Sequence, residues 1–158
     1  MFEHLLPQPI DNDYRGHTAG LWLFGLVITV KTLQSLLVLV AGAWVVPSAD
    51  GVPLDTFPVA AAQTVLAVWA QLGIARLILS VLGILVLVRY RSAVALMFAL
   101  LALQYLAGQL AFQLIPLLRT GSPPGPIANA ILFALMLVGL VLALRKQDPP
   151  RAPGAGAT

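Results

Sequence analysis

The stretch that decides the fold is LWLFGLVITVKTLQSLLVLVAGAWVV, residues 21–46, an apolar run with Lys31, Gln34 and Ser35 in its middle. It is longer than the ~20 residues that a helix needs to cross ~30 Å of hydrocarbon. We therefore expect a membrane-spanning helix here. Three further apolar runs of comparable length follow along the chain.

The composition places the whole chain in the same class. Of its 158 residues, 59% are hydrophobic and only 9% are charged, and the mean hydropathy is +0.93. These values lie far outside the usage of soluble domains. The nine Lys and Arg residues are scattered along the chain, most of them at predicted helix ends, and do not form one patch, so we expect no nucleic-acid partner. The chain has no Cys, which excludes thiolate chemistry.

The apolar runs and the Pro- and Gly-rich breaks between them predict an all-α integral membrane protein, a four-helix up-down bundle. The predicted spans are residues 18–46, 58–88, 92–118 and 126–144. A segment of residues 1–17 precedes the transmembrane domain of residues 18–146. The tail of residues 147–158 is rich in Pro, Gly and Ala, and we expect it to be disordered.

The distribution of Lys and Arg predicts the orientation. With four spans, both termini and the 89–91 link share one side, which carries most of the positive charges: Arg15, Arg89, Arg91, Arg145, Lys146 and Arg151. The loops on the other side carry only Arg119. By the positive-inside rule, both termini are cytoplasmic. We expect a multi-pass protein of a bacterial-type inner (plasma) membrane.

A layer of polar residues crosses the predicted spans at one depth. Lys31, Arg76 and Gln104 each lie about twelve residues from the cytoplasmic end of their helix, or roughly 18 Å at 1.5 Å per residue. A Lys or Arg at the middle of a membrane costs on the order of 2.5–3.5 kcal/mol. Every carboxylate is expected in a tail or a loop: Glu3, Asp11, Asp13, Asp50, Asp55 and Asp148. The predicted spans thus hold two cations without an internal counter-ion.

Further polar side chains accompany this layer. Small residues on the faces of Lys31 and Arg76 indicate that these faces pack against protein. The candidate ligand-binding residues are Lys31, Gln34, Ser35, Gln71, Arg76, Ser80 and Gln104. The last span has Asn129 near its outer end and is otherwise apolar, so we expect it to serve lipid contact and packing.

Three arrangements would compensate the positive charges of Lys31 and Arg76. Glutamine side chains and free backbone carbonyls of the chain itself could solvate them. An anionic or accepting ligand, such as a lipid head group, a carboxylate or a quinone carbonyl, could bind them. An acidic residue of another chain could pair with them, which would make the protein a subunit of a larger complex.

No catalytic or metal site is predicted. His4 and His17 are the only histidines and lie outside the hydrocarbon, so zinc lacks ligands. Neither Ser35 nor Ser80 has a His or carboxylate at its depth to act as a base. The sequence from Asp11 to Asp13 does not fit a calcium loop, and we expect it to cap the first helix.

The predicted function is therefore non-enzymatic. We expect an accessory or binding subunit whose Lys/Arg/Gln layer engages an anionic or acceptor group of a lipid, a quinone-like ligand or a partner subunit. One alternative is a small oligomeric transporter or channel for an anion. Another is a membrane enzyme acting on a lipid. In each case the lipid bilayer is a partner. The chain can also form a homo-oligomer or belong to a larger membrane complex. The sequence indicates no particular cofactor.

Overall fold

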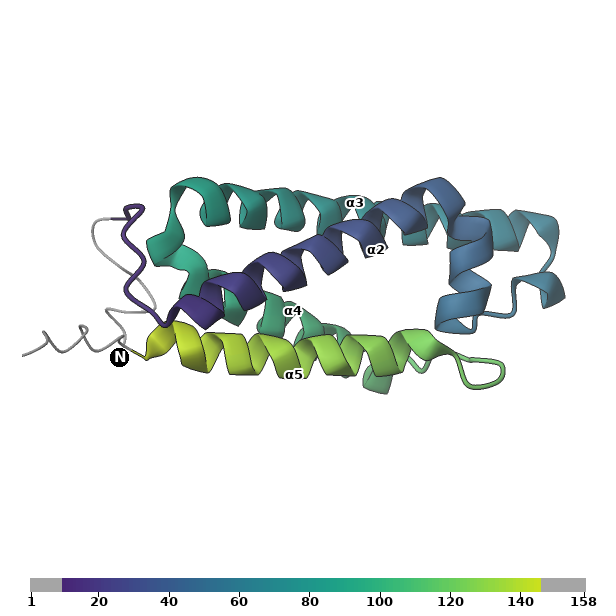
Figure 1. The fold of residues 1–158 in the computed structure, drawn as a ribbon. Helices are drawn as coiled ribbons and strands as arrows, with labels where there is room; N and C mark the ends of the chain where they lie inside the picture. The colour runs from purple at the N-terminus through teal and green to yellow at the C-terminus, as the bar shows by residue number, and fades with distance from the viewer. Residues whose placement is uncertain (1–9, 146–158) are drawn as a thin grey trace, which may run out of the picture.

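The computed structural model describes residues 10–145, which are all-helical (Figure 1). The long helices are α2 (Thr18–Asp50), α3 (Val59–Arg89), α4 (Val94–Leu114) and α5 (Pro124–Leu144), and the short 3-10 helices are η1 (Leu54–Thr56) and η2 (Arg91–Ala93). All four long helices are long and apolar enough to cross a membrane. The expectation of an all-α chain with four candidate spans is therefore confirmed. The predicted disorder of residues 147–158 lies outside the described residues.

The proline residues explain where the helices end. α4 ends at Leu114 and does not reach residue 118, because Ile115 precedes Pro116 and is extended (φ −127°, ψ 89°). α5 begins at Pro124, where the absence of an N–H is tolerated in the first turn. The first helix is capped by His17, whose Nδ1 accepts from the Ala19 N–H. The expected cap by residues 11–13 is thus wrong.

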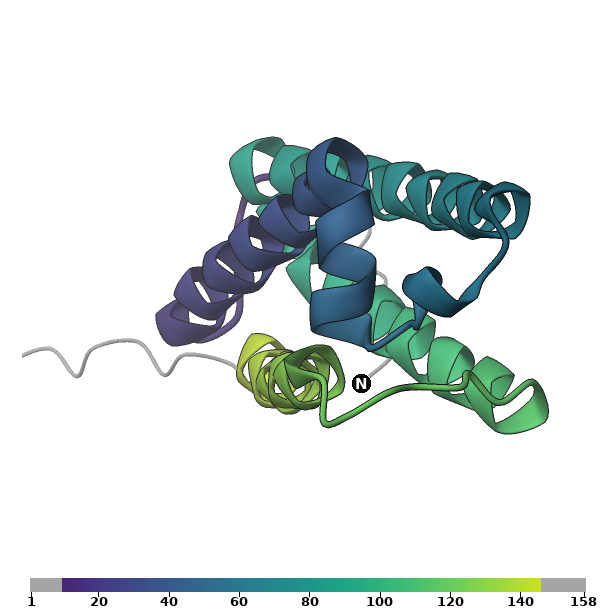
Figure 2. The ribbon, with the colours of Figure 1, turned by 90° about the vertical axis from the view of Figure 1, so that its right-hand side faces the viewer.

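α2 continues through Pro47 and ends four residues later than the predicted span, at Asp50. Its backbone leaves helical geometry once, at Ala41 (φ −136°, ψ 29°). Beyond this kink the chain turns across the long axis of the bundle, toward the start of α5 (Figures 1 and 2). Gly51 then closes the helix in the left-handed region (φ 74°), and its N–H donates to the Pro47 carbonyl. The kink brings the final turns of α2 back over the bundle.

The turned end of α2 is joined to the loop before α5. The Gly51 carbonyl accepts from the Thr120 N–H at 2.8 Å and from the Thr120 Oγ1 at 3.3 Å. A Cβ added to Gly51 would lie 2.9 Å from Pro123 Cγ. The loops after α2 and after α4 are therefore fixed to each other at one end of the molecule.

We expect Gly51→Ala to lower the free energy of unfolding by about 1–2 kcal/mol, the cost of a side chain in the left-handed region. Thermal unfolding in detergent micelles would measure it. Gly121→Ala is the matched control, because Gly121 also has a positive φ (68°) but no atom within 4 Å of an added Cβ. Both substitutions carry the cost of the left-handed backbone, and we expect the control to lose less because only a Cβ at Gly51 also meets Pro123. Equal losses would show that the contact with Pro123 is unimportant.

The four long helices do not form a closed ring. α2 packs on α3 and on α5, and α4 packs on α5, whereas α3 and α4 have few contacts. The view from the loop end shows α3 and α4 diverging (Figure 2). The bundle is consequently open on one side, between α3 and α4.

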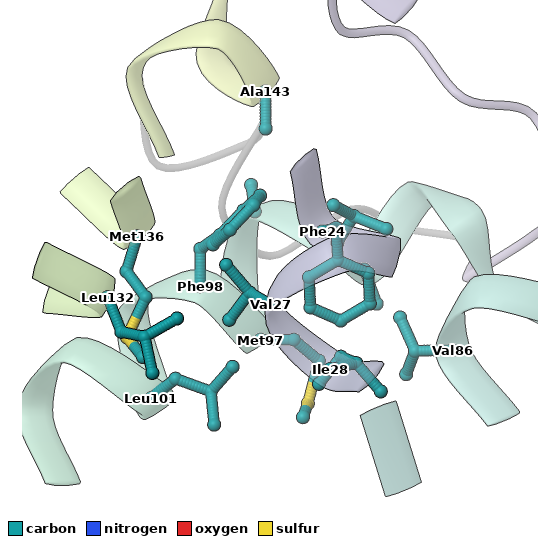
Figure 3. Packing of buried hydrophobic residues seen from close by; sticks show 13 residues of the cluster. Phe24, Val27, Ile28, Val86, Met97, Phe98, Leu101, Leu132, Met136 and Ala143 are labelled. Atoms are coloured by element: carbon teal, nitrogen blue, oxygen red, sulfur yellow. The ribbon is translucent and has the colours of Figure 1, made fainter. Parts of the chain in front are cut away.

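The best-packed region lies toward the other end, near the termini and η2. Phe24 and Phe98 are fully buried at its centre (Figure 3) and meet edge to face, with ring centroids 5.1 Å apart. A Cβ on Gly139 would overlap the Phe98 ring, and one on Gly83 would overlap the Ile28 side chain. The cluster contains Phe24, Val27, Ile28, Val86, Ala93, Val94, Ala95, Met97, Phe98, Leu101, Leu132, Met136 and Ala143. We call it the terminal core.

The segment before α2 lies against the same end. The Asp11 carbonyl accepts from the Ser92 Oγ at 2.8 Å, and the His17 N–H donates to the Leu142 carbonyl at 3.0 Å. The Tyr14 hydroxyl donates to the His17 carbonyl, and burial raises the pKa of Tyr14 to about 12. These contacts tie the N-terminal segment to η2 and α5.

Candidate functional site

Lys31, Arg76 and Gln104 line a single cavity of about 90 Å³, which we call the polar chamber. They come from α2, α3 and α4, and α5 adds Asn129. The full lining is Lys31, Asp50, Trp69, Arg76, Leu101, Gln104, Tyr105, Gly108, Gln109, Phe112, Arg119, Pro126 and Asn129. The polar layer deduced from helix depth is therefore brought together in space by all four long helices.

The charges around the polar chamber are unbalanced. Among the described lining residues, Lys31, Arg76 and Arg119 are cationic and Asp50 alone is anionic, a formal net charge of +2. The Asp50 carboxylate interacts electrostatically with Arg76 and with Arg119. Lys31 has no carboxylate partner within residues 10–145, and its Nζ donates to Asn129 Oδ1 at 3.4 Å. The chamber is thus suited to an anionic group.

The structure differs from the sequence-based expectations for Asp50 and for the last span. Asp50 does not lie in a loop as predicted: it ends α2 and faces Arg76, because the helix continues through Pro47 and turns at Ala41. The chain therefore supplies part of a counter-charge. The last span was expected to serve only lipid contact and packing, yet Asn129 lines the chamber and binds Lys31.

Arg119 is a further charged residue of the chamber that is not among the residues predicted for the site. It follows the end of α4, where Pro116 has released the backbone from the helix, and it lines the chamber. Its guanidinium lies over the Phe112 ring, 5.4 Å from the centroid. In the sequence, Arg119 is the only cation of the predicted outer loops, and this feature could have identified it as a candidate site residue.

Four predicted site residues lie elsewhere. The Ser35 hydroxyl donates to the Lys31 carbonyl at 2.8 Å, and the Ser80 hydroxyl donates to the Arg76 carbonyl at 3.0 Å. Both are buried and satisfied by their own helices. Gln34 and Gln71 line neither the polar chamber nor the neighbouring groove. Ligand binding by these four residues stays a prediction that the geometry does not favour.

A larger cavity of about 700 Å³ lies beside the polar chamber, between α3 and α4. We call it the apolar groove. The two cavities share Trp69, Arg76, Gln104, Gly108 and Phe112. The rest of the groove is lined by Val52, Phe57, Thr64, Val65, Val68, Leu72, Ala111, Pro116, Leu117 and Leu118. A cationic chamber thus adjoins an apolar groove and shares five lining residues with it, on the side where the bundle is open.

The indole of Trp69 stands at the junction of the two cavities. Its Nε1 is buried and has no hydrogen-bond partner among residues 10–145. A buried donor without an acceptor is costly. Trp69 thus keeps an unused donor in the wall that the two cavities share.

No known protein family, curated protein or solved structure shows significant similarity to this chain. Within residues 10–145, no group of three His, Asp or Glu side chains could hold a metal ion. What defines the molecule is a bundle of four apolar helices, open on one side, with a cationic chamber inside.

Proposed function

We propose that this chain is a non-enzymatic binding or accessory protein of a bacterial-type inner (plasma) membrane, with both termini cytoplasmic. Its polar chamber holds the anionic or accepting group of a lipid-like or quinone-like ligand. One observation carries this proposal: the cationic chamber adjoins an apolar groove between α3 and α4 and shares five lining residues with it. Such a pair of cavities matches a molecule with one polar end and one apolar end.

The charge distribution supports the orientation. Arg89 and Arg91 flank the link between α3 and α4, while Arg15 and Arg145 lie near the ends of the bundle on the same side. Arg119 lies at the other end and faces the chamber. By the positive-inside rule, the terminal core is on the cytoplasmic side. The polar chamber and the apolar groove then belong to the outer half of the membrane.

The packing favours binding over transport. A path for an anion through one copy of the chain would have to continue from the polar chamber to the cytoplasmic end. That end is filled by the terminal core, where Phe24, Val27 and Phe98 have no exposed surface. A dead-ended chamber can hold a ligand, but it gives no route across the membrane.

Native mass spectrometry of the gently extracted protein tests this function. We expect an added mass that corresponds to a lipid-like or quinone-like molecule, and we expect the double variant Lys31→Met/Arg76→Met to lose it. Arg89→Met/Arg91→Met is the matched control, because these two cations line neither cavity. It should keep the ligand. A wild-type protein without any added mass, or with the same mass in both double variants, would contradict the proposal.

A further inference from the structure

The charge of the polar chamber distinguishes between a neutral quinone carbonyl and an anionic head group as the bound group. A quinone carbonyl is neutral: it accepts hydrogen bonds but leaves the formal charge of +2 in place. An anionic head group accepts the same hydrogen bonds and also compensates the excess charge. Uncompensated charge inside a membrane is costly, and hydrogen bonds between charged partners are about twice as strong as neutral ones. The chamber therefore favours an anion.

The size of the polar chamber limits the head group. A cavity needs about 10–15 Å³ to hold one water molecule, so about 90 Å³ accommodates a group of a few heavy atoms. A carboxylate or a phosphate monoester has this size. A sugar, with its ring and hydroxyl groups, is larger than either. The chamber thus fits a small anion with two or three accepting oxygens.

The apolar groove determines what is attached to that anion. Its volume of about 700 Å³ lies within the range of ~300–1,000 Å³ for sites that enclose a small molecule. Val65, Val68 and Leu72 line it from α3, and Gly108 on α4 leaves open space where a side chain would stand. The groove faces the gap between α3 and α4, which in a membrane opens onto lipid. A hydrocarbon chain can enter there sideways.

From these features, and on the basis of the binding function proposed above, we infer that the ligand is a membrane amphiphile with a small anionic head and a hydrocarbon tail. Its carboxylate or phosphate monoester lies in the polar chamber among Arg76, Arg119 and Lys31, beside the indole of Trp69. Its tail lies in the apolar groove. The ligand enters from the outer leaflet between α3 and α4.

Trp69 provides a direct readout. The chain has three Trp residues, so the variant Trp22→Phe/Trp44→Phe keeps Trp69 as its only indole. In micelles of a neutral detergent, hexadecanoate brominated next to its carboxylate should quench Trp69 fluorescence in a saturable manner. Unlabelled hexadecanoate and hexadecyl phosphate should compete. Hexadecanol lacks the charge, and acetate and inorganic phosphate lack the tail, so these three should not compete.

Each outcome of the competition has a definite meaning. Equal competition by hexadecanol would overturn the anionic head, and displacement by acetate or phosphate alone would mean that the site takes a free anion from water. Binding of a short-chain benzoquinone without binding of hexadecanoate would overturn this inference but leave the proposed function intact. Failure of all probes, together with an empty protein in native mass spectrometry, would refute both.

Two variants locate the ligand. Arg76→Gln should weaken the binding of hexadecanoate about ten- to a hundredfold, the range expected for the loss of a charged hydrogen bond. Arg89→Gln, on the same helix but outside both cavities, should leave binding unchanged. Equal effects of the two substitutions would show that only the overall charge matters.

Gly108→Leu fills the junction of the two cavities without removing a charge. An added Cβ meets no atom within 4 Å, so the fold should tolerate the side chain. We expect quenching to be lost while the unfolding temperature stays the same or rises, because Leu is favoured over Gly inside a helix. Ala107→Leu, at an exposed neighbouring position that lines neither cavity, is the control. Wild-type binding by Gly108→Leu would overturn the placement of the ligand.

Discussion

Phe98→Ala is expected to lower the free energy of unfolding by about 3–5 kcal/mol, the usual loss when a buried Phe is truncated to Ala. Phe98 has no exposed surface, it packs edge to face on Phe24, and it lies over Gly139 of α5. The substitution would therefore leave a cavity at the centre of the terminal core, where α2, α4 and α5 meet. Denaturant titration in mixed micelles, followed by circular dichroism, measures this loss.

The contact with Gly139 can be tested by a double-mutant cycle. Gly139→Ala alone should destabilise the protein by about 1–3 kcal/mol, because the added methyl group overlaps the Phe98 ring. In the Phe98→Ala background, the same change should be neutral or stabilising, since Ala is favoured over Gly in a helix by about 1 kcal/mol. An equal cost in both backgrounds would contradict the described packing.

Lys31→Met should raise the free energy of unfolding in detergent micelles by about 1–3 kcal/mol. A Lys at the centre of a membrane helix costs about 2.5–3.5 kcal/mol, and its removal would recover this cost. The loss of the long hydrogen bond to Asn129 (3.4 Å) reduces the gain by about 0.5–1.5 kcal/mol. The substitution also relieves repulsion from Arg76. A gain in stability would show that Lys31 is retained for binding and not for folding.

Arg76→Met is the comparison for that experiment, and we expect it to lower the free energy of unfolding. Arg76 interacts with the Asp50 carboxylate, so its removal leaves Asp50 with Arg119 alone and should cost up to about 3 kcal/mol. The double variant Arg76→Met/Asp50→Asn should recover most of the loss. A destabilising Lys31→Met would contradict the prediction and indicate that Lys31 serves packing.

Much of the fold could be predicted from the sequence, because each helix is encoded by a local pattern. The apolar runs are long enough to fix the number and type of the elements, and residues such as Pro116 and Pro124 stand within a few positions of the helix ends. The juxtaposition of Lys31, Arg76 and Gln104 was also accessible, since residues at one depth of parallel or antiparallel helices are neighbours when their faces turn inward.

The rest of the site could not be deduced in this way, because it depends on a change of chain direction. An estimate of depth from the number of residues along a helix assumes that the helix is straight, and it treats Asp50 as part of a loop. The non-helical backbone at Ala41 and the continuation through Pro47 place Asp50 over the polar chamber instead. Arg119 lies in the loop after α4 and Asn129 lies on α5, and both line the same cavity. No local pattern places Asp50 or Asn129 there, whereas Arg119 stands out in the sequence only as the lone cation of the predicted outer loops.

The uneven packing of the bundle has a consequence for its dynamics. Most of the buried apolar contacts lie in the terminal core, whereas α3 and α4 touch little near the apolar groove. Regions with few buried contacts open locally at a fraction of the global unfolding free energy. The ends of α3 and α4 away from the terminal core are therefore the parts of the bundle that are held least to each other. In the proposed binding function, loading of the chamber needs only a local opening between these ends, with a rate that is independent of the rate of global unfolding.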